Sequence, residues 1–178
     1  MKRLLTLSLF MASTALYAQT DYCKQIKKEV TDNNTSFSYE TPYTESAPPA
    51  VRASRNFGTT EDGEFDNFAL VLTIPCEFQD LLVKSKEGNE SEKEEYKIAV
   101  EFDDKTKITD DTTLISHDKK GDGSALRYAY FPVNNQNIKA LTTKKIVRIY
   151  LATAKLDVPA DMATAMQQYL ICLKNTKK

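Results

Sequence analysis

Residues 67–78 read NFALVLTIPCEF and carry the clearest secondary-structure signal in the chain. In an extended strand, alternate side chains point to opposite faces, so the even positions share one face. That face is almost wholly apolar and carries Phe68, Leu70, Leu72, Ile74, Cys76 and Phe78. Pro75 has no N–H to donate to a sheet ladder, so the strand should reach an edge or a bulge there. The stretch therefore predicts a long strand with one face in the protein core.

Strand-like segments continue on both sides of this stretch. They are residues 36–41, 51–57, 96–104, 112–116, 124–133 and 144–152. In YKIAVEFDD (96–104), Ile98, Val100 and Phe102 alternate with polar residues, which is typical of an antiparallel sheet with one face in water. Hairpin-length connections separate this segment from the next two, so the three predict a β-meander.

Helical periodicity is confined to the two ends of the mature chain. Residues 21–31 place Tyr22, Cys23, Ile26 and Val30 on one side of a short amphipathic helix. Residues 159–175 predict a longer helix, with Asp157 as the candidate N-cap and Pro159 in the first turn. Its apolar stripe comprises Met162, Ala165, Met166, Tyr169, Cys172 and Leu173.

These elements predict an α+β fold. We expect an antiparallel β-sheet of about six to eight strands with the C-terminal helix packed on one face. A β-sandwich with peripheral helices is the alternative. Residues 19–178 are expected to form one such domain, with the short N-terminal helix and a polar lead-in before the strands.

The first 18 residues have the layout of a secretory signal peptide. Lys2 and Arg3 precede an apolar run from residue 4 to residue 16, which is too short for a comfortable membrane span. Cleavage is expected after Ala18, with Ala15 as the alternative. The sequence therefore predicts an exported protein, periplasmic or secreted, without a membrane-spanning helix.

Three cysteines, Cys23, Cys76 and Cys172, remain after cleavage, and each falls on the apolar side of its predicted element. They suit either three buried small side chains or one disulfide with one thiol left over. Export favours a bridge, and Cys23–Cys172 would close a very long loop between the two predicted helices. Residues 20–22 are not the small residues that precede an acylated cysteine, so no lipid anchor is expected at Cys23.

Composition excludes several classes of function. The chain has 24 basic and 25 acidic residues, and loss of Lys2 and Arg3 leaves 22 against 25. This balance argues against nucleic-acid binding. Phosphate-binding glycine motifs are missing, and one histidine with three scattered cysteines does not make a zinc site, so no cofactor or metal is expected.

Catalytic groups are scarce apart from the carboxylates. His117 is the single histidine, and it lies in a predicted polar loop away from the cysteines, so neither a Cys/His pair nor a serine triad is expected. Paired carboxylates of a small hydrolase remain as an alternative. The candidate pairs lie in apparent turns at 94–95, 103–104 and 110–111.

Aromatic and arginine side chains supply the candidate binding residues. Tyr128 and Tyr130 share one face of a predicted strand, next to Arg127, and Tyr150 lies outward on another strand near Arg148. Tyrosine and arginine are favoured at binding hot spots, so these residues are candidates for contact with a protein or a glycan. The competing interpretation is that the rings pack beneath another segment of the chain.

The signal ending in YAQ, the strand NFALVLTIPCEF and the tail KKIVRIYL…LDVPADMATAMQQYL resemble small secreted proteins of gut-type Gram-negative anaerobes. Those proteins form families without an assigned function, so the resemblance implies export and assigns no residue roles. The function expected from the sequence is an exported, non-catalytic binding or interaction module. A small hydrolase with paired carboxylates and a structural envelope protein are the alternatives.

Overall fold

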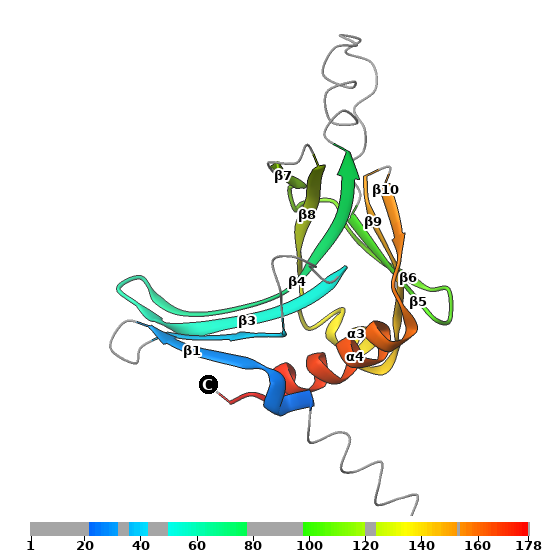
Figure 1. The fold of residues 1–178 in the computed structure, drawn as a ribbon. Helices are drawn as coiled ribbons and strands as arrows, with labels where there is room; N and C mark the ends of the chain where they lie inside the picture. The colour runs from blue at the N-terminus through cyan, green and yellow to red at the C-terminus, as the bar shows by residue number, and fades with distance from the viewer. Residues whose placement is uncertain are drawn as a thin grey trace, which may run out of the picture.

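The computed structural model describes residues 22–31, 36–42, 50–77, 98–119, 124–152 and 154–177. These residues form antiparallel strands in two sheets, with the C-terminal helix packed against them (Figure 1). The predicted α+β class, with antiparallel strands and a C-terminal helix on the sheet, is confirmed. The strands are divided between a six-stranded and a four-stranded sheet, whereas the sequence led us to expect a single one.

The six-stranded sheet, sheet A, is organised around one long strand. Its order is β1 (Lys27–Thr31), β2 (Ser36–Glu40), β3 (Val51–Thr60), β4 (Gly63–Glu77), β8 (Ser124–Pro132) and β7 (Ser116–Lys119). Residues 63–72 of β4 pair with β3, and residues 69–77 pair with β8. Pro75 therefore lies where β4 pairs with β8 alone among the described strands, which agrees with the edge position expected for a proline.

The closed end of the β3–β4 hairpin extends to one side of the molecule, beyond the part of β3 that pairs with β2 (Figure 1). Its turn is formed by Glu61 and Asp62, and Gly63 follows with φ of +126°. Such a backbone conformation is costly for residues with a Cβ, so glycine suits this position. The Thr60 hydroxyl donates a hydrogen bond to the Gly63 carbonyl at 3.2 Å, which closes the turn.

The four-stranded sheet, sheet B, draws its strands from both sides of β8 in the sequence. Its order is β10 (Ala154–Asp157), β9 (Ile146–Leu151), β5 (Ile98–Phe102) and β6 (Lys107–Asp110). The predicted meander is wrong, because β5 pairs with β6 and β9 while β8 pairs with β4 and β7. The strand predicted at 112–116 is also wrong for most of its length. The Asp110 carboxylate accepts hydrogen bonds from the backbone N–H and hydroxyl of Thr112, which turns the chain there.

The two ends of the domain differ from each other in how well local periodicity predicted them. Helix α4 (Ala160–Asn175) matches the expected C-terminal helix, although Pro159 occupies its N-cap and Asp157 lies in β10. At the other end only residues 22–25 are helical, and 27–31 form β1. The longer N-terminal helix was wrong because Lys28 and Val30 pair across to Tyr39 and Phe37 of β2, and sheet pairing outweighs the local helical pattern.

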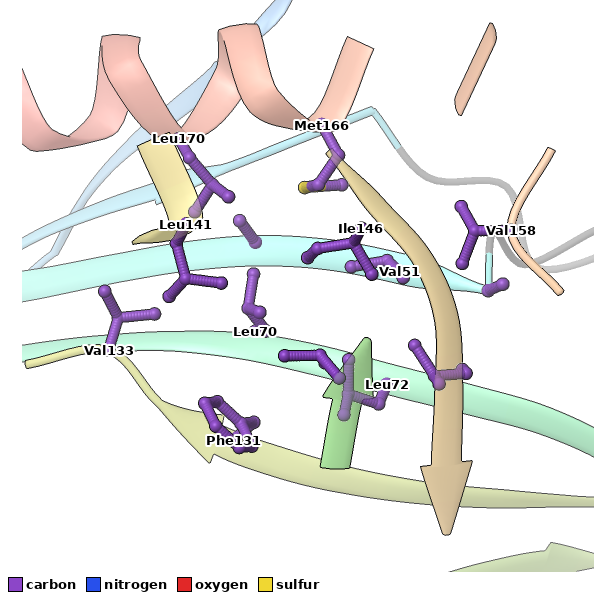
Figure 2. Close-up of a cluster of buried hydrophobic side chains, with 14 of the residues drawn as sticks. Val51, Leu70, Leu72, Phe131, Val133, Leu141, Ile146, Val158, Met166 and Leu170 are labelled. Atoms are coloured by element: carbon purple, nitrogen blue, oxygen red, sulfur yellow. The ribbon is translucent and has the colours of Figure 1, made fainter. Parts of the chain in front are cut away.

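One hydrophobic core joins both sheets with the short helix α3 and the C-terminal helix α4. Helix α3 (Ile138–Thr143) contributes Leu141, and α4 contributes Met166 and Leu170. They meet Leu72 of β4 and Ile146 of β9, as Figure 2 shows. On β8, the core buries the inward-facing Ala129 and Phe131, which are 0% and 1% exposed. This burial orients the strand, because it sends the alternate side chains of β8 to the outer face of sheet A.

A disulfide between Cys23 and Cys172 ties the N-terminal segment to α4, with Cα atoms 5.4 Å apart and a sequence separation of 149. This is the pair that the sequence favoured. Next to it, the Tyr22 and Tyr169 rings meet edge to face at 5.4 Å, and the Tyr169 hydroxyl donates to Gln25 Oε1 at 2.5 Å. The predicted signal peptide, residues 1–18, lies outside the described residues. Within the described part of the chain, no helix has the length and apolarity to cross a membrane.

Candidate binding surface

The strand β8 presents two chemically different faces. Its inner face carries Ala125, Arg127, Ala129 and Phe131. Its outer face carries Leu126, Tyr128, Tyr130 and Pro132, which we call the β8 stripe. Every residue of the stripe is at least partly exposed, and Tyr130 is 53% exposed. All four of these consecutive outward side chains are aliphatic or aromatic. The solvent face of an antiparallel sheet usually carries charged and other polar side chains instead.

The two tyrosines of the β8 stripe are in contact. The Tyr128 and Tyr130 ring centroids lie 6.1 Å apart with an angle of 86° between the planes, an edge-to-face arrangement. Such a pair holds both rings in defined orientations, which reduces the entropy that a partner has to remove on binding. The stripe thus has a fixed aromatic centre.

The neighbouring strands extend the stripe on one side and border it with polar groups on the other. Pro75 of β4 is exposed and lies opposite Leu126. On β7, Ser116 pairs with Tyr128, and Asp118 pairs with Leu126. An apolar centre with a polar border is the common layout of protein-binding surfaces.

Arg148 and Tyr150 belong to a separate cluster on the outer face of sheet B. The Tyr150 hydroxyl donates to Glu101 Oε2 at 2.5 Å and accepts from Lys107 Nζ at 3.1 Å. Arg148 Nε donates to Asp157 Oδ1 at 2.5 Å, and Arg148 Nη1 lies 3.9 Å from Glu101 Oε1. We call these five residues the Tyr150 network.

The charges of the Tyr150 network stabilise one another. Hydrogen bonds from Tyr150 and then Lys107 lower the pKa of Glu101, and the hydrogen bond from Arg148 lowers the pKa of Asp157. The pKa of Arg148 is raised, first by the hydrogen bond to Asp157 and then by Tyr150. Because these groups already have partners within the chain, a ligand would have to replace existing contacts there.

The structure therefore distributes the five predicted binding residues over three places. Tyr128 and Tyr130 lie together on the β8 stripe, Arg148 and Tyr150 lie together on sheet B, and Arg127 lies apart on the inner face of β8. The predicted grouping of Arg127 with the two tyrosines is wrong, because adjacent strand positions point to opposite faces.

Several residues of these surfaces were not singled out from the sequence. They are Leu126, Pro132 and Pro75 beside the tyrosines, and Glu101, Lys107 and Asp157 around Tyr150. The uninterrupted apolar character of positions 126, 128, 130 and 132 could have indicated the β8 stripe. Nothing local in the sequence places Glu101 against Tyr150, 49 residues away.

Asp104 and Asp110, one carboxylate from each of two predicted pairs, do not suit a general acid. A hydrogen bond from Lys144, followed by those from Thr106, lowers the pKa of Asp104 to about 2. Burial opposes ionisation of Asp110, but hydrogen bonds from Thr112 and Thr113 outweigh it and lower its pKa. A carboxyl group that donates a proton near neutral pH needs a raised pKa instead. The pair at 94–95 lies outside the described residues.

In the described ranges, no group of three or more His, Cys, Asp and Glu side chains is arranged to hold a metal ion. Comparison of the chain with protein-family models, with curated proteins and with solved structures finds no match.

Proposed function

We propose that this protein is an exported, non-catalytic binding module that docks a partner protein through the β8 stripe. The observation that carries the proposal is the apolar outer face of β8, with Tyr130 53% exposed at its centre. Exposed aromatic side chains on a fixed apolar surface with a polar border are the features that concentrate binding energy at protein interfaces.

The ring geometry favours a protein over a glycan as the ligand. A sugar ring stacks on the flat face of an aromatic ring, so an extended glycan platform needs rings that lie side by side in similar orientations. Tyr128 and Tyr130 are instead at 86° to each other. This arrangement offers one ring face, one ring edge and two hydroxyl groups, which suits aliphatic side chains and backbone carbonyls of a protein partner.

Export is supported by the Cys23–Cys172 disulfide, because such bridges persist in oxidising compartments outside the cytosol. The disulfide joins residues near the two ends of the described chain, so it stabilises the domain without taking part in the β8 stripe. The basic start and apolar run of residues 2–16 support the same location.

The direct test is site-specific photo-crosslinking in the native host. A benzophenone amino acid is placed at Tyr130 in one variant and at Val30 in another, because Val30 is 44% exposed and lies on β1, at the opposite edge of sheet A. We expect a defined adduct from position 130 and none of the same mass from position 30. The adduct is then identified by mass spectrometry, and a second copy of this chain is one of the identities that the mass distinguishes.

Affinity measurements with the identified partner complete the test. Tyr130→Ala is expected to weaken binding by about 2 kcal/mol, roughly thirtyfold, as for a central hot spot. Val30→Ala serves as the control and should bind as the wild type does. Equal affinity of the Tyr130→Ala variant and the wild type, with both folded, would overturn the β8 stripe as the binding surface.

A further inference from the structure

The arginine that the sequence grouped with the tyrosines has a different environment on the inner face of β8. Arg127 Nε is fully enclosed and has no hydrogen-bond partner. Among the described residues, no carboxylate forms an ion pair with Arg127. A buried polar group without a partner is unfavourable, and the penalty is larger when the group carries a charge. The position therefore calls for an acceptor with negative charge.

A second base lies beside it. His117 of β7 is the register partner of Arg127 on the neighbouring antiparallel strand, so the two side chains share the inner face, with Cβ atoms about 5 Å apart. His117 is exposed, so this end of sheet A is open to solvent. On the other side of Arg127, the register partner is Ile74 of β4, which is 5% exposed. The pair thus has an apolar wall on one side and access from water on the other.

Among the described residues around the two bases, none supplies a compensating negative charge. The pKa of His117 is lowered, first by partial desolvation of its ring where it meets the sheet and then by the positive charge of Arg127. Asp118, the adjacent acidic residue on β7, belongs to the opposite face, where it pairs with Leu126. Ala125 and Ala129, which flank Arg127 along the inner face of β8, are apolar.

We propose that Arg127 and His117 form a binding site for a small oxyanion, a carboxylate or a phosphate group. A guanidinium presents parallel N–H donors to two oxygens of such a group. Arg127 as a whole is partly exposed, so a rotation of its side chain would bring the enclosed Nε–H to the ligand and satisfy the donor that is now without a partner. His117 supplies a second contact from the solvent side. The site lies on the face of β8 opposite the β8 stripe and does not depend on the function proposed there.

The test uses NMR spectroscopy of the isotope-labelled full protein at one fixed pH. His117 is the single histidine of the chain, so its ring signal needs no assignment, and the Arg127 Nε–H signal is assigned by its loss in Arg127→Lys. The protein is titrated with inorganic phosphate, with acetate, and with chloride at equal ionic strength. We expect both signals to move saturably, with a dissociation constant roughly in the millimolar range, and to stay nearly fixed in chloride.

The outcomes distinguish a phosphate ligand from a carboxylate ligand, and they also show whether the proposed site exists. Saturation with phosphate alone assigns a phosphoryl ligand, saturation with acetate alone assigns a carboxylate, and saturation with both assigns a general oxyanion site. Movement that is linear, or equal in chloride, overturns the site. Because the His117 signal is read in the wild-type protein and needs no variant for its assignment, this outcome does not depend on whether a variant folds.

Variants then measure how much each of the two bases contributes to the affinity for the oxyanion. Arg127→Lys keeps the charge but loses the parallel donors, and we expect affinity to fall at least roughly tenfold. His117→Asn should keep saturable movement of the Arg127 signal at lower affinity. Unchanged affinity of a folded Arg127→Lys protein would overturn the assignment of Arg127 as the main contact.

Discussion

Tyr150 shows how one hydroxyl group can organise several charges. It donates to Glu101 and accepts from Lys107, while Lys107 also lies 3.2 Å from Glu101. The three residues come from β9, β5 and β6, so the hydroxyl links adjacent strands of sheet B across its outer face. Polar contacts of this kind restrict the side chains more than they stabilise the fold, because exposed ion pairs contribute little in water.

Tyr150→Phe is expected to raise the pKa of Glu101 toward its ordinary value of 4.5, because the largest cause of its lowered pKa is the hydrogen bond from Tyr150. A carboxyl group with a lowered pKa stabilises the folded state above its unfolded pKa, and this contribution is lost as the pH falls toward the folded value. The variant should therefore lose less stability than the wild type when the pH is lowered below 4.5.

Carbon-13 NMR titration of the Glu101 carboxyl group, with thermal unfolding at neutral and acid pH, measures both effects. Tyr130→Phe is the matched control, because the Tyr130 hydroxyl makes no hydrogen bond with the described residues, and it should leave the Glu101 titration unchanged. An identical Glu101 titration in Tyr150→Phe and the wild type would show that the hydroxyl does not hold this carboxylate.

Among the elements, the C-terminal end of α4 accepts hydrogen bonds from a side chain of β3. Arg55 Nη1 donates to the carbonyls of Leu173 at 2.8 Å, Lys174 at 3.2 Å and Thr176 at 3.1 Å. The rest of the guanidinium binds Asp66 of β4 through two hydrogen bonds of 3.0 and 2.8 Å. The last carbonyls of a helix have no partner within the helix, and here Arg55 donates to them. The same guanidinium binds Asp66, so Arg55 joins the end of α4 to the β3–β4 hairpin.

Arg55→Ala is expected to lower the free energy of unfolding by about 2–3 kcal/mol, because it removes charge-assisted hydrogen bonds and leaves helix carbonyls without this donor. Arg55→Lys should recover only part of the loss, since an ammonium cannot bind a carboxylate and several carbonyls in the same planar arrangement. Urea-induced unfolding measures these differences.

The control for Arg55 is an arginine that does not contact a helix end. Arg148 of β9 donates from Nε to Asp157 Oδ1, and the Asp157 side chain is 75% exposed. Exposed ion pairs of this kind contribute little to stability in water. If Arg148→Ala destabilises the protein as much as Arg55→Ala does, the contacts with the end of α4 are not the source of the effect.

At the scale of the whole molecule, the Cys23–Cys172 disulfide joins the first described residues to the last helix. The loop that it closes spans 149 residues, and it therefore includes both sheets. A bridge across so long a loop restricts the unfolded chain strongly, whereas the folded chain already holds the two ends together by the packing of Tyr22 on Tyr169.

The double variant Cys23→Ala/Cys172→Ala is expected to unfold about 2–5 kcal/mol more readily than the wild type, because its unfolded state gains chain entropy. Urea-induced unfolding with and without a reducing thiol measures the size of this loss and tests whether the disulfide is its cause. The reductant should destabilise the wild type to the level of the double variant and leave the double variant unchanged. A wild type that unfolds at the same urea concentration in both conditions contradicts a stabilising bridge.

The elements whose pattern depends only on neighbouring residues could be predicted without knowing the fold. Alternation over 67–78 located β4, and the spacing of apolar residues after Pro159 located α4, because side-chain direction along one strand or helix follows from backbone geometry. The same alternation places Arg127 on the opposite face from Tyr128 and Tyr130. The sequence could therefore have excluded the predicted grouping of these three residues.

Which strands are neighbours, and which polar groups have partners, depends on contacts between segments far apart in the sequence. The sheet that contains β5 draws β9 from beyond β8, and the helical pattern of residues 27–31 yields to pairing with β2. The contact between Glu101 and Tyr150 and the missing partner of Arg127 Nε also follow from strand pairing. Pairing depends on which apolar faces bury one another across long connections, and no local pattern records that competition.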